Sequence, residues 1–219
     1  AGAYTVASAG AEAAVKIAGE VVSNATRRLG HQLVVSLETL NRATAESFGE
    51  EARFARDIFE AAVMNEKDTL GSVLELASGD TSLPGYLAKM AKAVDGVGAA
   101  GLAALDAHRA AVAQKLGVKL APVVLTDLEK RAARIIPRPT AKVRQDGYRE
   151  YQKYITAVPA AERAKYPVQG KDLVIANPGE LQLLINGKHS ALDIRKMIDA
   201  QNERLSTLQA VLNQLEILK

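Results

Sequence analysis

Three histidines and no cysteine make up this chain's supply of the side chains that most often hold transition metals. His31, His108 and His189 lie far apart, and none belongs to an HExxH or HxD pattern. Zinc ligands usually come in pairs a few residues apart, so this spacing does not favour a metal site, although folding could still bring the three together. The lack of cysteine excludes disulfides and Cys-ligated metal centres. We expect no catalytic residue, no cofactor and no metal in this chain.

Two other patterns carry residue types that could bind a phosphate or a metal. The stretch GVGAAG at 96–101 is similar to the glycine pattern of dinucleotide-binding folds, but it follows a predicted helix and not a strand. Glu50 and Glu51 form an acidic pair of the kind that supplies a base and a ligand in some two-zinc peptidases, but no other ligand lies near them in the sequence. We interpret the glycines as helix-packing residues and the glutamates as first-turn residues stabilised by the helix dipole.

Basic residues are concentrated in one segment of the chain. Residues 1–126 carry 12 Lys/Arg and 14 Asp/Glu, residues 127–171 carry 11 and 5, and residues 172–219 carry 5 and 6. The formal net charges of these segments are therefore −2, +6 and −1, within a total of +3. The middle segment could contact nucleic-acid phosphates or an acidic partner. Six of its side chains are candidate anion or partner contacts: Lys130, Arg131, Arg134, Arg138, Lys142 and Arg144.

The elements that position these residues are predicted to be helices. Aromatic residues are only 4% of the chain and alanine is frequent, a composition that suits closely packed helices better than sheets. Apolar residues recur at three- and four-residue steps over 4–44, 46–78 and 86–116. Long helices joined by short connections favour an antiparallel bundle, which we assign to residues 1–121. The predicted fold class is mainly α.

The predicted contact faces of the bundle are rich in small residues. In the first helix, or pair of helices if Gly30 divides it, one face is formed by residues at helical spacing: Val6, Gly10, Ala13, Ile17 and Val21. In the third helix, Gly96, Gly98 and Gly101 each lower the helix propensity by about 1 kcal/mol relative to alanine. We interpret these glycines as positions where a neighbouring helix approaches closely.

Prolines divide the chain beyond residue 121, where six of the seven are found. We assign 122–171 to a basic connector that contains short helices. Helices are expected at 125–134, near 147–156 and at 159–165. The stretch 134–148 is expected to be extended, because residues that precede proline avoid the helical conformation.

The last segment, 172–219, is predicted to form a small helical module. The stretch GELQLLING suits a strand or a short helix that ends at an Asn-Gly turn. Ser190 is expected to cap a helix at 191–202, and Ser206 a second helix at 207–218. Such a pair resembles the helical part of a winged-helix fold. Their apolar side chains are expected to share one small core: Leu192, Met197, Ile198, Leu208, Leu212 and Leu215.

A winged helix would make the chain a nucleic-acid-binding protein. The last helix would then offer polar side chains to base edges, and Gln209, Asn213 and Gln214 are available. The helix has no arginine, and Lys219 lies only at its end, so it lacks the phosphate anchors expected of such a helix. We therefore rank nucleic-acid binding second.

Stretches at both ends of the chain resemble a known family. "LQLLINGKHSALDIRKMIDAQ" with "LSTLQAVLNQLEILK" is similar to the tail that follows the catalytic domain in some bacterial zinc aminopeptidases, the two-zinc metallopeptidase family twenty-eight. "AGAYTVASAGAEAAVKIAGEVV" resembles the helix at the end of such a catalytic domain. The resemblance implies a non-catalytic accessory or assembly region of a larger peptidase. The family's His-x-Asp and further metal ligands have no matching positions here, so none is carried over.

Three functional interpretations follow. The first is an accessory region that packs on a catalytic domain or on a second copy of the chain, and a start at Ala1 without methionine would suit a fragment or a processed subunit. The second is a winged-helix nucleic-acid-binding protein, and the third is an enzyme whose site is built from scattered residues. No run of about 18 apolar residues is present, so we expect no membrane span. The compartment, cytoplasmic or secreted, stays open.

Overall fold

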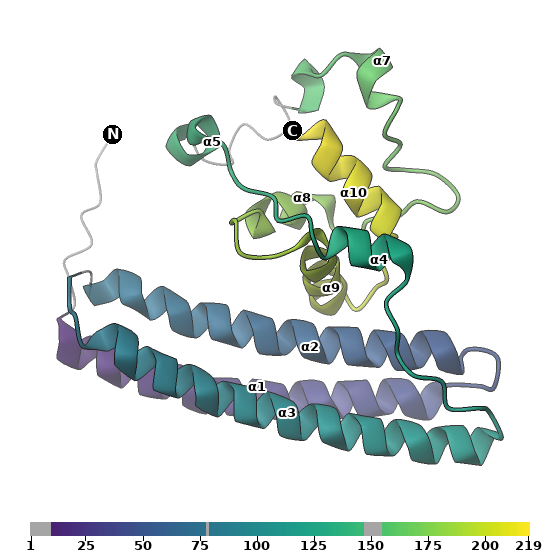
Figure 1. Cartoon of the computed structure of the whole chain (residues 1–219), viewed down its shortest axis with the longest axis horizontal. Helices are drawn as coiled ribbons and strands as arrows, with labels where there is room; N and C mark the ends of the chain where they lie inside the picture. The colour runs from purple at the N-terminus through teal and green to yellow at the C-terminus, as the bar shows by residue number, and fades with distance from the viewer. Residues whose placement is uncertain (1–9, 78, 147–154) are drawn as a thin grey trace. The chain divides into compact units, whose positions relative to one another are not determined.

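The computed structural model describes residues 10–77, 79–146 and 155–219, which form helices joined by loops (Figure 1). Within these ranges there is no strand, and one isolated antiparallel bridge joins Gly170 to Leu173. The predicted mainly α fold is confirmed. Across the same ranges, no helix combines the length and the apolar character that crossing a membrane requires.

The chain divides into two compact units, Ala1–Leu120 and Ala121–Lys219. The second unit contains both the basic connector and the small module that the sequence predicts. The connector is part of this unit because Ala132, near its beginning, is fully buried in one cluster with Leu192 and Leu212. Burial of apolar surface thus joins the two segments into one core.

Three long helices form the first unit. They are α1 (Ala11–Arg42), α2 (Phe48–Ser72), which continues into the 3-10 helix η1 (Val73–Ala77), and α3 (Leu83–Leu116). α1 and α3 run in the same direction, and α2 runs opposite to both (Figure 1). The predicted antiparallel bundle is confirmed. α1 is a single helix that continues through Gly30.

Side chains and a glycine define the two ends of α3. Asp80 Oδ1 accepts hydrogen bonds from the Ser82 N–H and hydroxyl, each at 2.7 Å, and from the Leu83 N–H at 3.0 Å. The bond from the Ser82 hydroxyl, together with the backbone bonds, holds the pKa of the Asp80 carboxyl below its ordinary value. At the other end Gly117 has φ +67°, a left-handed conformation that glycine adopts without strain.

The buried face of α1 agrees only in part with the predicted face. Ile17 and Val21 of the predicted face are partly buried and pack against the core, whereas the fully buried residues lie at other positions. Among the residues that precede Gly30 in the sequence, the four most deeply buried apolar ones are Ala14, Ala18, Ala25 and Leu29. Ala13 is exposed, Gly10 precedes the helix, and Val6 lies outside the described residues. Alanines occur on several sides of α1, so they give little hydrophobic contrast between the faces, and the helical period alone could not identify the fully buried positions.

Two glycines of α3 allow α2 to approach closely, as the sequence predicts. A Cβ added at Gly101 would overlap the ring of Phe59, and one added at Gly98 would lie 2.9 Å from Cγ2 of Val63. Gly96 differs, since a Cβ there would meet nothing within 4 Å. The packing interpretation therefore holds for two of the three glycines and is wrong for Gly96.

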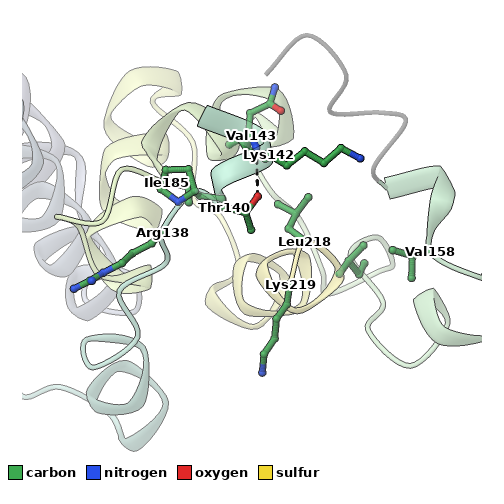
Figure 2. Close-up of a pocket in the computed structure, with 11 residues that line it drawn as sticks. Arg138, Thr140, Lys142, Val143, Val158, Ile185, Leu218 and Lys219 are labelled. Carbon is green, nitrogen blue, oxygen red and sulfur yellow. Dashed lines mark hydrogen bonds between the residues drawn. The ribbon is translucent and has the colours of Figure 1, made fainter. Parts of the chain in front are cut away.

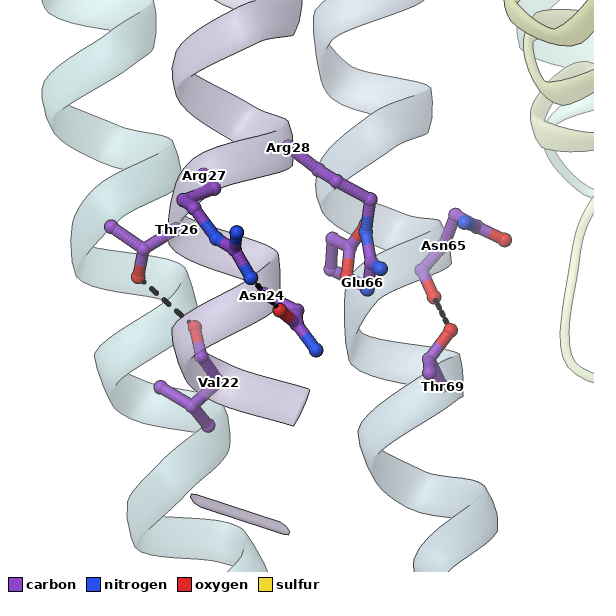
Figure 3. Close-up of polar contacts among 8 residues, drawn as sticks. All are labelled: Val22, Asn24, Thr26, Arg27, Arg28, Asn65, Glu66 and Thr69. Carbon is purple, nitrogen blue, oxygen red and sulfur yellow. Dashed lines mark hydrogen bonds and ion pairs between the residues drawn. The ribbon is translucent and has the colours of Figure 1, made fainter. Parts of the chain in front are cut away.

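Ion pairs join α2 to both of its neighbours. The Arg28 guanidinium of α1 donates two hydrogen bonds to the Glu66 carboxylate, each at 2.6 Å (Figure 3). The Glu66 side chain is only 3% exposed, and its hydrogen bond with Arg28 holds the pKa of the guanidinium above its ordinary value. On the other side, Arg56 of α2 donates to both carboxylate oxygens of Asp106 on α3, at 3.0 and 3.1 Å.

Short helices make up the second unit. Those that lie wholly within the described residues are, in chain order, α4 (Asp127–Ala132), α5 (Ala141–Asp146), α7 (Ala160–Arg163), α8 (Pro178–Leu181), the 3-10 helix η3 (Gln182–Leu184), α9 (Ala191–Asn202) and α10 (Leu208–Ile217). The helices predicted at 125–134, 159–165, 191–202 and 207–218 are confirmed, the first two in shorter form. Most of the helix predicted at 147–156 lies outside the described residues. The stretch GELQLLING is helical for most of its length and forms no strand.

α5 corrects the expectation of an extended stretch at 134–148. A proline restricts the residue directly before it, so the restriction covers Ile136 and Arg138 and ends at the second proline. Thr140 follows this proline, and its hydroxyl accepts a hydrogen bond from the Val143 N–H at 3.3 Å. This bond satisfies one of the free donors at the start of a helix, and α5 begins here.

Ser190 caps α9 as predicted, but Ser206 does not cap α10. The Ser190 hydroxyl oxygen accepts a hydrogen bond from the Asp193 N–H at 3.2 Å, and the Asp193 carboxylate accepts one from the Ser190 N–H at 3.0 Å. The Ser206 hydroxyl instead accepts a bond from the Ala176 N–H at 3.0 Å. Thr207 occupies the N-cap of α10 without a side-chain cap bond. Ser206 therefore ties two loops together.

The side chains expected to share one core in the C-terminal module lie in two clusters. One cluster contains Leu192 and Leu212 with Leu208 packed against them, and α4 contributes to it. The other contains Ile198, and α8 contributes to it. Leu215 packs against both clusters. The core is divided because different segments cover different sides of the α9–α10 pair.

Candidate functional site

All six cations predicted to contact an anion or a partner are exposed in the second unit. Three of them lie on α4 or shortly after it, and three lie just before α5 or within it. Lys130 forms an ion pair with Asp127 at 3.0 Å, and Arg144 Nε donates a hydrogen bond to the Pro139 carbonyl oxygen at 3.3 Å. Exposed positions leave such long side chains accessible to a partner.

Arg138 and Lys142 line a pocket of about 300 Å³ in the second unit (Figure 2). Three segments contribute most of its lining residues: the segment that contains α5, η3 with the residues that follow it, and the end of α10. Five aliphatic side chains form most of its apolar wall: Val143, Val158, Ile185, Ile217 and Leu218. Sequence spacing did not reveal this wall, because its residues come from segments that meet only in the folded chain.

A tight turn places Arg138 at the edge of this pocket. Gly187 has φ +79°, and a Cβ added there would lie 3.2 Å from Cγ of Arg138. The Gly187 N–H donates a hydrogen bond to the Pro137 carbonyl oxygen at 3.1 Å. Both the backbone conformation and the close approach favour glycine. The Asn-Gly turn expected from the sequence thus holds the segment before α5 in place.

Positive charge surrounds the pocket. Arg138, Lys142 and Lys219 line it, and no Asp or Glu does so among the described residues. Figure 2 shows their charged ends extending outward in different directions around Leu218. Lys219 Nζ lies 3.9 Å from the Glu216 carboxylate, and the lysine side chain is 79% exposed. The site therefore combines an aliphatic wall with a basic rim.

The three histidines have separate structural settings. His108 Nε2 on α3 lies 2.8 Å from the Asn41 amide oxygen on α1, a contact between two helices of the bundle. His189 is buried, and its backbone N–H donates to the Asn186 side-chain oxygen at 3.3 Å. His31 is exposed on α1. Over the described part of the chain, no group of three His, Cys, Asp or Glu side chains is placed to hold a metal ion.

The other two patterns lie inside helices, as interpreted from the sequence. Glu50 and Glu51 occupy the first turn of α2, where negative charge is stabilised by the helix dipole. The glycines of GVGAAG lie within α3, without the preceding strand that a dinucleotide site requires. Neither pattern belongs to the pocket.

Asp199 of α9 is a fully buried titratable residue. Its carboxylate accepts hydrogen bonds from the Ser206 N–H at 2.7 Å and from the Arg195 guanidinium at 3.1 Å. Burial raises the pKa of Asp199 to about 6, and these two partners oppose the rise only in part. The carboxylate holds the turn between α9 and α10 and does not line the pocket, so we assign it to stability.

The amide side chains of α10 that could read bases are used within the second unit. Asn213 is 8% exposed, and its Nδ2 donates a hydrogen bond to the Pro167 carbonyl oxygen at 2.6 Å. Gln209 Nε2 donates to the Asn213 side-chain oxygen at 2.7 Å. Gln214 is 4% exposed. Side chains held in this way cannot reach base edges without giving up these positions.

Comparison of the chain with protein-family models, with curated proteins and with solved structures finds no match. The chemistry of the pocket and of the basic segment therefore rests on their own residues and geometry.

Proposed function

We propose that this chain is a non-catalytic accessory or assembly region of a zinc aminopeptidase-like protein, which acts through helix packing and protein–protein contacts. The observation that carries the contact role is the exposure of all six cations of the basic segment. Charged surfaces of this kind favour association with a partner of opposite charge. The peptidase context is supported by the resemblance of the two chain ends to regions at and beyond a catalytic domain.

A winged-helix nucleic-acid-binding protein is the alternative. The exposed cations would suit phosphates as well as carboxylates, so they do not separate the two functions. The buried Asn213 and Gln214 on α10 weigh against base recognition by this helix. The described residues also supply no strand for a wing. Sequence-specific DNA binding, measured by fluorescence anisotropy, would establish the alternative.

Co-expression with a two-zinc aminopeptidase catalytic domain of the resembling family tests the preferred function. A complex should persist through size-exclusion chromatography at about 0.15 M salt and weaken as salt rises. The variant Arg131→Glu with Arg134→Glu should weaken it strongly. The matched control, Lys89→Glu with Lys92→Glu, makes the same charge change at exposed positions of α3. Failure of the wild-type chain to bind, or equal weakening by both variants, would contradict the proposal.

The same function implies that the isolated chain cleaves no peptide and holds no stoichiometric zinc. The sequence has no cysteine, and its three histidines are not spaced as zinc ligands. Elemental analysis after dialysis measures the metal directly. One tightly bound zinc ion per chain would overturn this expectation and favour the interpretation as an enzyme.

A further inference from the structure

The geometry points to a binding site for an aliphatic monocarboxylate in the pocket between α5 and the end of α10. This site shares Arg138 and Lys142 with the basic segment of the proposed assembly function. The assembly function is tested at Arg131 and Arg134, which do not line the pocket, so failure of one proposal can be distinguished from failure of the other. The inference rests on three features of the pocket: its size, its aliphatic wall and its basic rim.

The volume and the aliphatic wall of the pocket indicate which hydrocarbon part of a ligand would fit. A volume of about 300 Å³ lies at the lower end of the range for small-molecule sites. Among the described residues that line the pocket none is aromatic, so a flat ring would find no stacking partner among them. Branched aliphatic side chains such as Val143, Ile185 and Leu218 suit a flexible chain of methylene groups. A chain of roughly ten carbons is of the right scale.

The rim selects the head group of the ligand. Arg138 and Lys142 place two positive charges at the pocket on one segment, and Lys219 adds a third from the end of α10. Their long, flexible stems lie along an apolar surface while the charged ends reach solvent, which is the usual behaviour of such side chains. An anionic head at the mouth would be attracted by the positive charge of Arg138 and Lys142, whereas a cationic head would be repelled.

A single free carboxylate suits the pocket better than the surface of a membrane. The aliphatic side chains line an inward space, so an individual chain must enter it to bury its methylenes. A bilayer presents a flat face, which would contact the basic rim but leave the wall unfilled. Free decanoate and anionic vesicles therefore distinguish the two sources of an anionic lipid chain.

Titration of the full chain with sodium decanoate below its micellar concentration tests the inference. Isothermal calorimetry gives the affinity, and NMR amide shifts locate the site, which we expect at Val143, Ile185 and Leu218. In the series from hexanoate to decanoate, each added methylene should tighten binding by about twofold to fourfold. Decanol and decyltrimethylammonium should each bind at least about threefold more weakly than decanoate.

Charge variants test the rim. Arg138→Gln with Lys142→Gln should weaken decanoate binding by about threefold to tenfold. The matched control, Arg131→Gln with Arg134→Gln, removes the same charge away from the pocket and should leave the affinity unchanged. Val143→Asp should abolish binding, and a circular dichroism melt shows whether the variant folds. If it does not fold, the charge variants and the ligand series still decide.

Four outcomes would overturn the inference. They are an affinity that does not change with chain length, equal binding of decanol and decanoate, equal loss in the two charge variants, and binding to phosphatidylglycerol vesicles without binding to free decanoate. The last of these would assign the basic rim to a membrane surface.

Discussion

The first unit consists of helices of 32, 25 and 34 residues, whereas the longest helix among the described residues of the second unit has 12. Every helix leaves four N–H groups and four carbonyl groups unpaired at its ends, whatever its length. A unit of short helices therefore has far more unpaired groups per residue than a bundle of long ones. The two units meet this demand by different means.

The second unit uses side chains to bind backbone groups. Capping boxes begin α4, from Thr126 to Glu129, and α9. The Asn177 side chain caps α8, and the side chains of Ser206 and Asn213 bind backbone groups of distant segments. The first unit depends more on close contacts between helices and on ion pairs between them. Substitutions that change volume or break ion pairs should therefore dominate in the bundle, and substitutions of polar side chains should have larger effects in the second unit.

The largest effects should come from the apolar cores, where the two units do not differ. Leu29→Ala in the bundle and Leu212→Ala in the second unit should each lower the free energy of unfolding by about 2–5 kcal/mol, because both side chains are buried. Urea unfolding followed by circular dichroism measures the loss. A cost below about 1 kcal/mol for Leu212→Ala would mean that polar contacts alone hold the second unit.

Close helix contact in the bundle should give the next effect. Gly101→Ala should destabilise by about 1–3 kcal/mol, because its Cβ would overlap the Phe59 ring. Gly96→Ala is the matched control in the same helix, and it should stabilise by about 0.5–1 kcal/mol, since it gains helix propensity and meets no neighbour. Melting temperatures of both variants test the pair. Stabilisation by both would show that α2 and α3 are not closely packed.

The ion pair between α1 and α2 gives a third test. Arg28→Met should cost about 1–3 kcal/mol, because it leaves the Glu66 carboxylate buried without this partner. Arg28→Met combined with Glu66→Met should recover part of that loss, since no buried charge remains. A double-mutant cycle from urea unfolding measures the coupling. If the effects of the two substitutions were additive, the ion pair between Arg28 and Glu66 would contribute nothing to the stability of the bundle.

The pH dependence of the second unit should depend on Asp199. The unfolded chain releases this proton near pH 3.8 and the folded chain near pH 6, so the contribution is fully present below 3.8 and is lost as the pH rises through about 6. Between about pH 5 and 8 the wild-type chain should lose about 1–2 kcal/mol relative to Asp199→Asn.

Urea unfolding at a series of pH values measures this difference. The control is Asp127→Asn, where the side chain is 99% exposed. If the difference in the free energy of unfolding between wild type and Asp199→Asn stayed constant with pH, the pKa of Asp199 in the folded chain would not be about 6.

The smallest expected effects on stability come from two amide side chains of α10, Asn213 and Gln209. Asn213→Ala should cost about 1–2 kcal/mol, because it leaves the Pro167 carbonyl without its donor. Gln209→Ala should cost less than about 0.5 kcal/mol, since Gln209 is partly exposed and bonds only to another side chain here. Equal costs would indicate that the Asn213 bond adds little to the second unit.

The sequence predicts the long helices well because helical periodicity persists over many turns. It also predicts the Ser190 cap, since capping is decided within four residues. It identifies the contact face of α1 only in part, because alanines on several sides hide its fully buried positions. It misses α5, because the restriction that proline places on the preceding residue was extended too far along the chain. Ser206 has the right residue type for a cap, but its partner Ala176 is distant in sequence.

The candidate site was only partly predictable for the same physical reason. The basic segment is visible as a local excess of charge, and the exposure of its cations follows from the cost of burying them. The aliphatic wall of the pocket is not visible, because Val143, Val158 and Leu218 carry no local signal and meet only after folding. Local patterns reveal charge and helices, whereas the pocket depends on long-range packing.

The odd number of long helices has a mechanical consequence. α1 and α3 run in the same direction, so the chain enters the bundle at one end and leaves it at the other (Figure 1). At 1.5 Å per residue, the 32 residues of α1 span roughly 48 Å. Tension applied through the two ends of this unit would load the helices in shear, along their whole length. Many contacts would then have to break together, so the bundle would resist unfolding under tension.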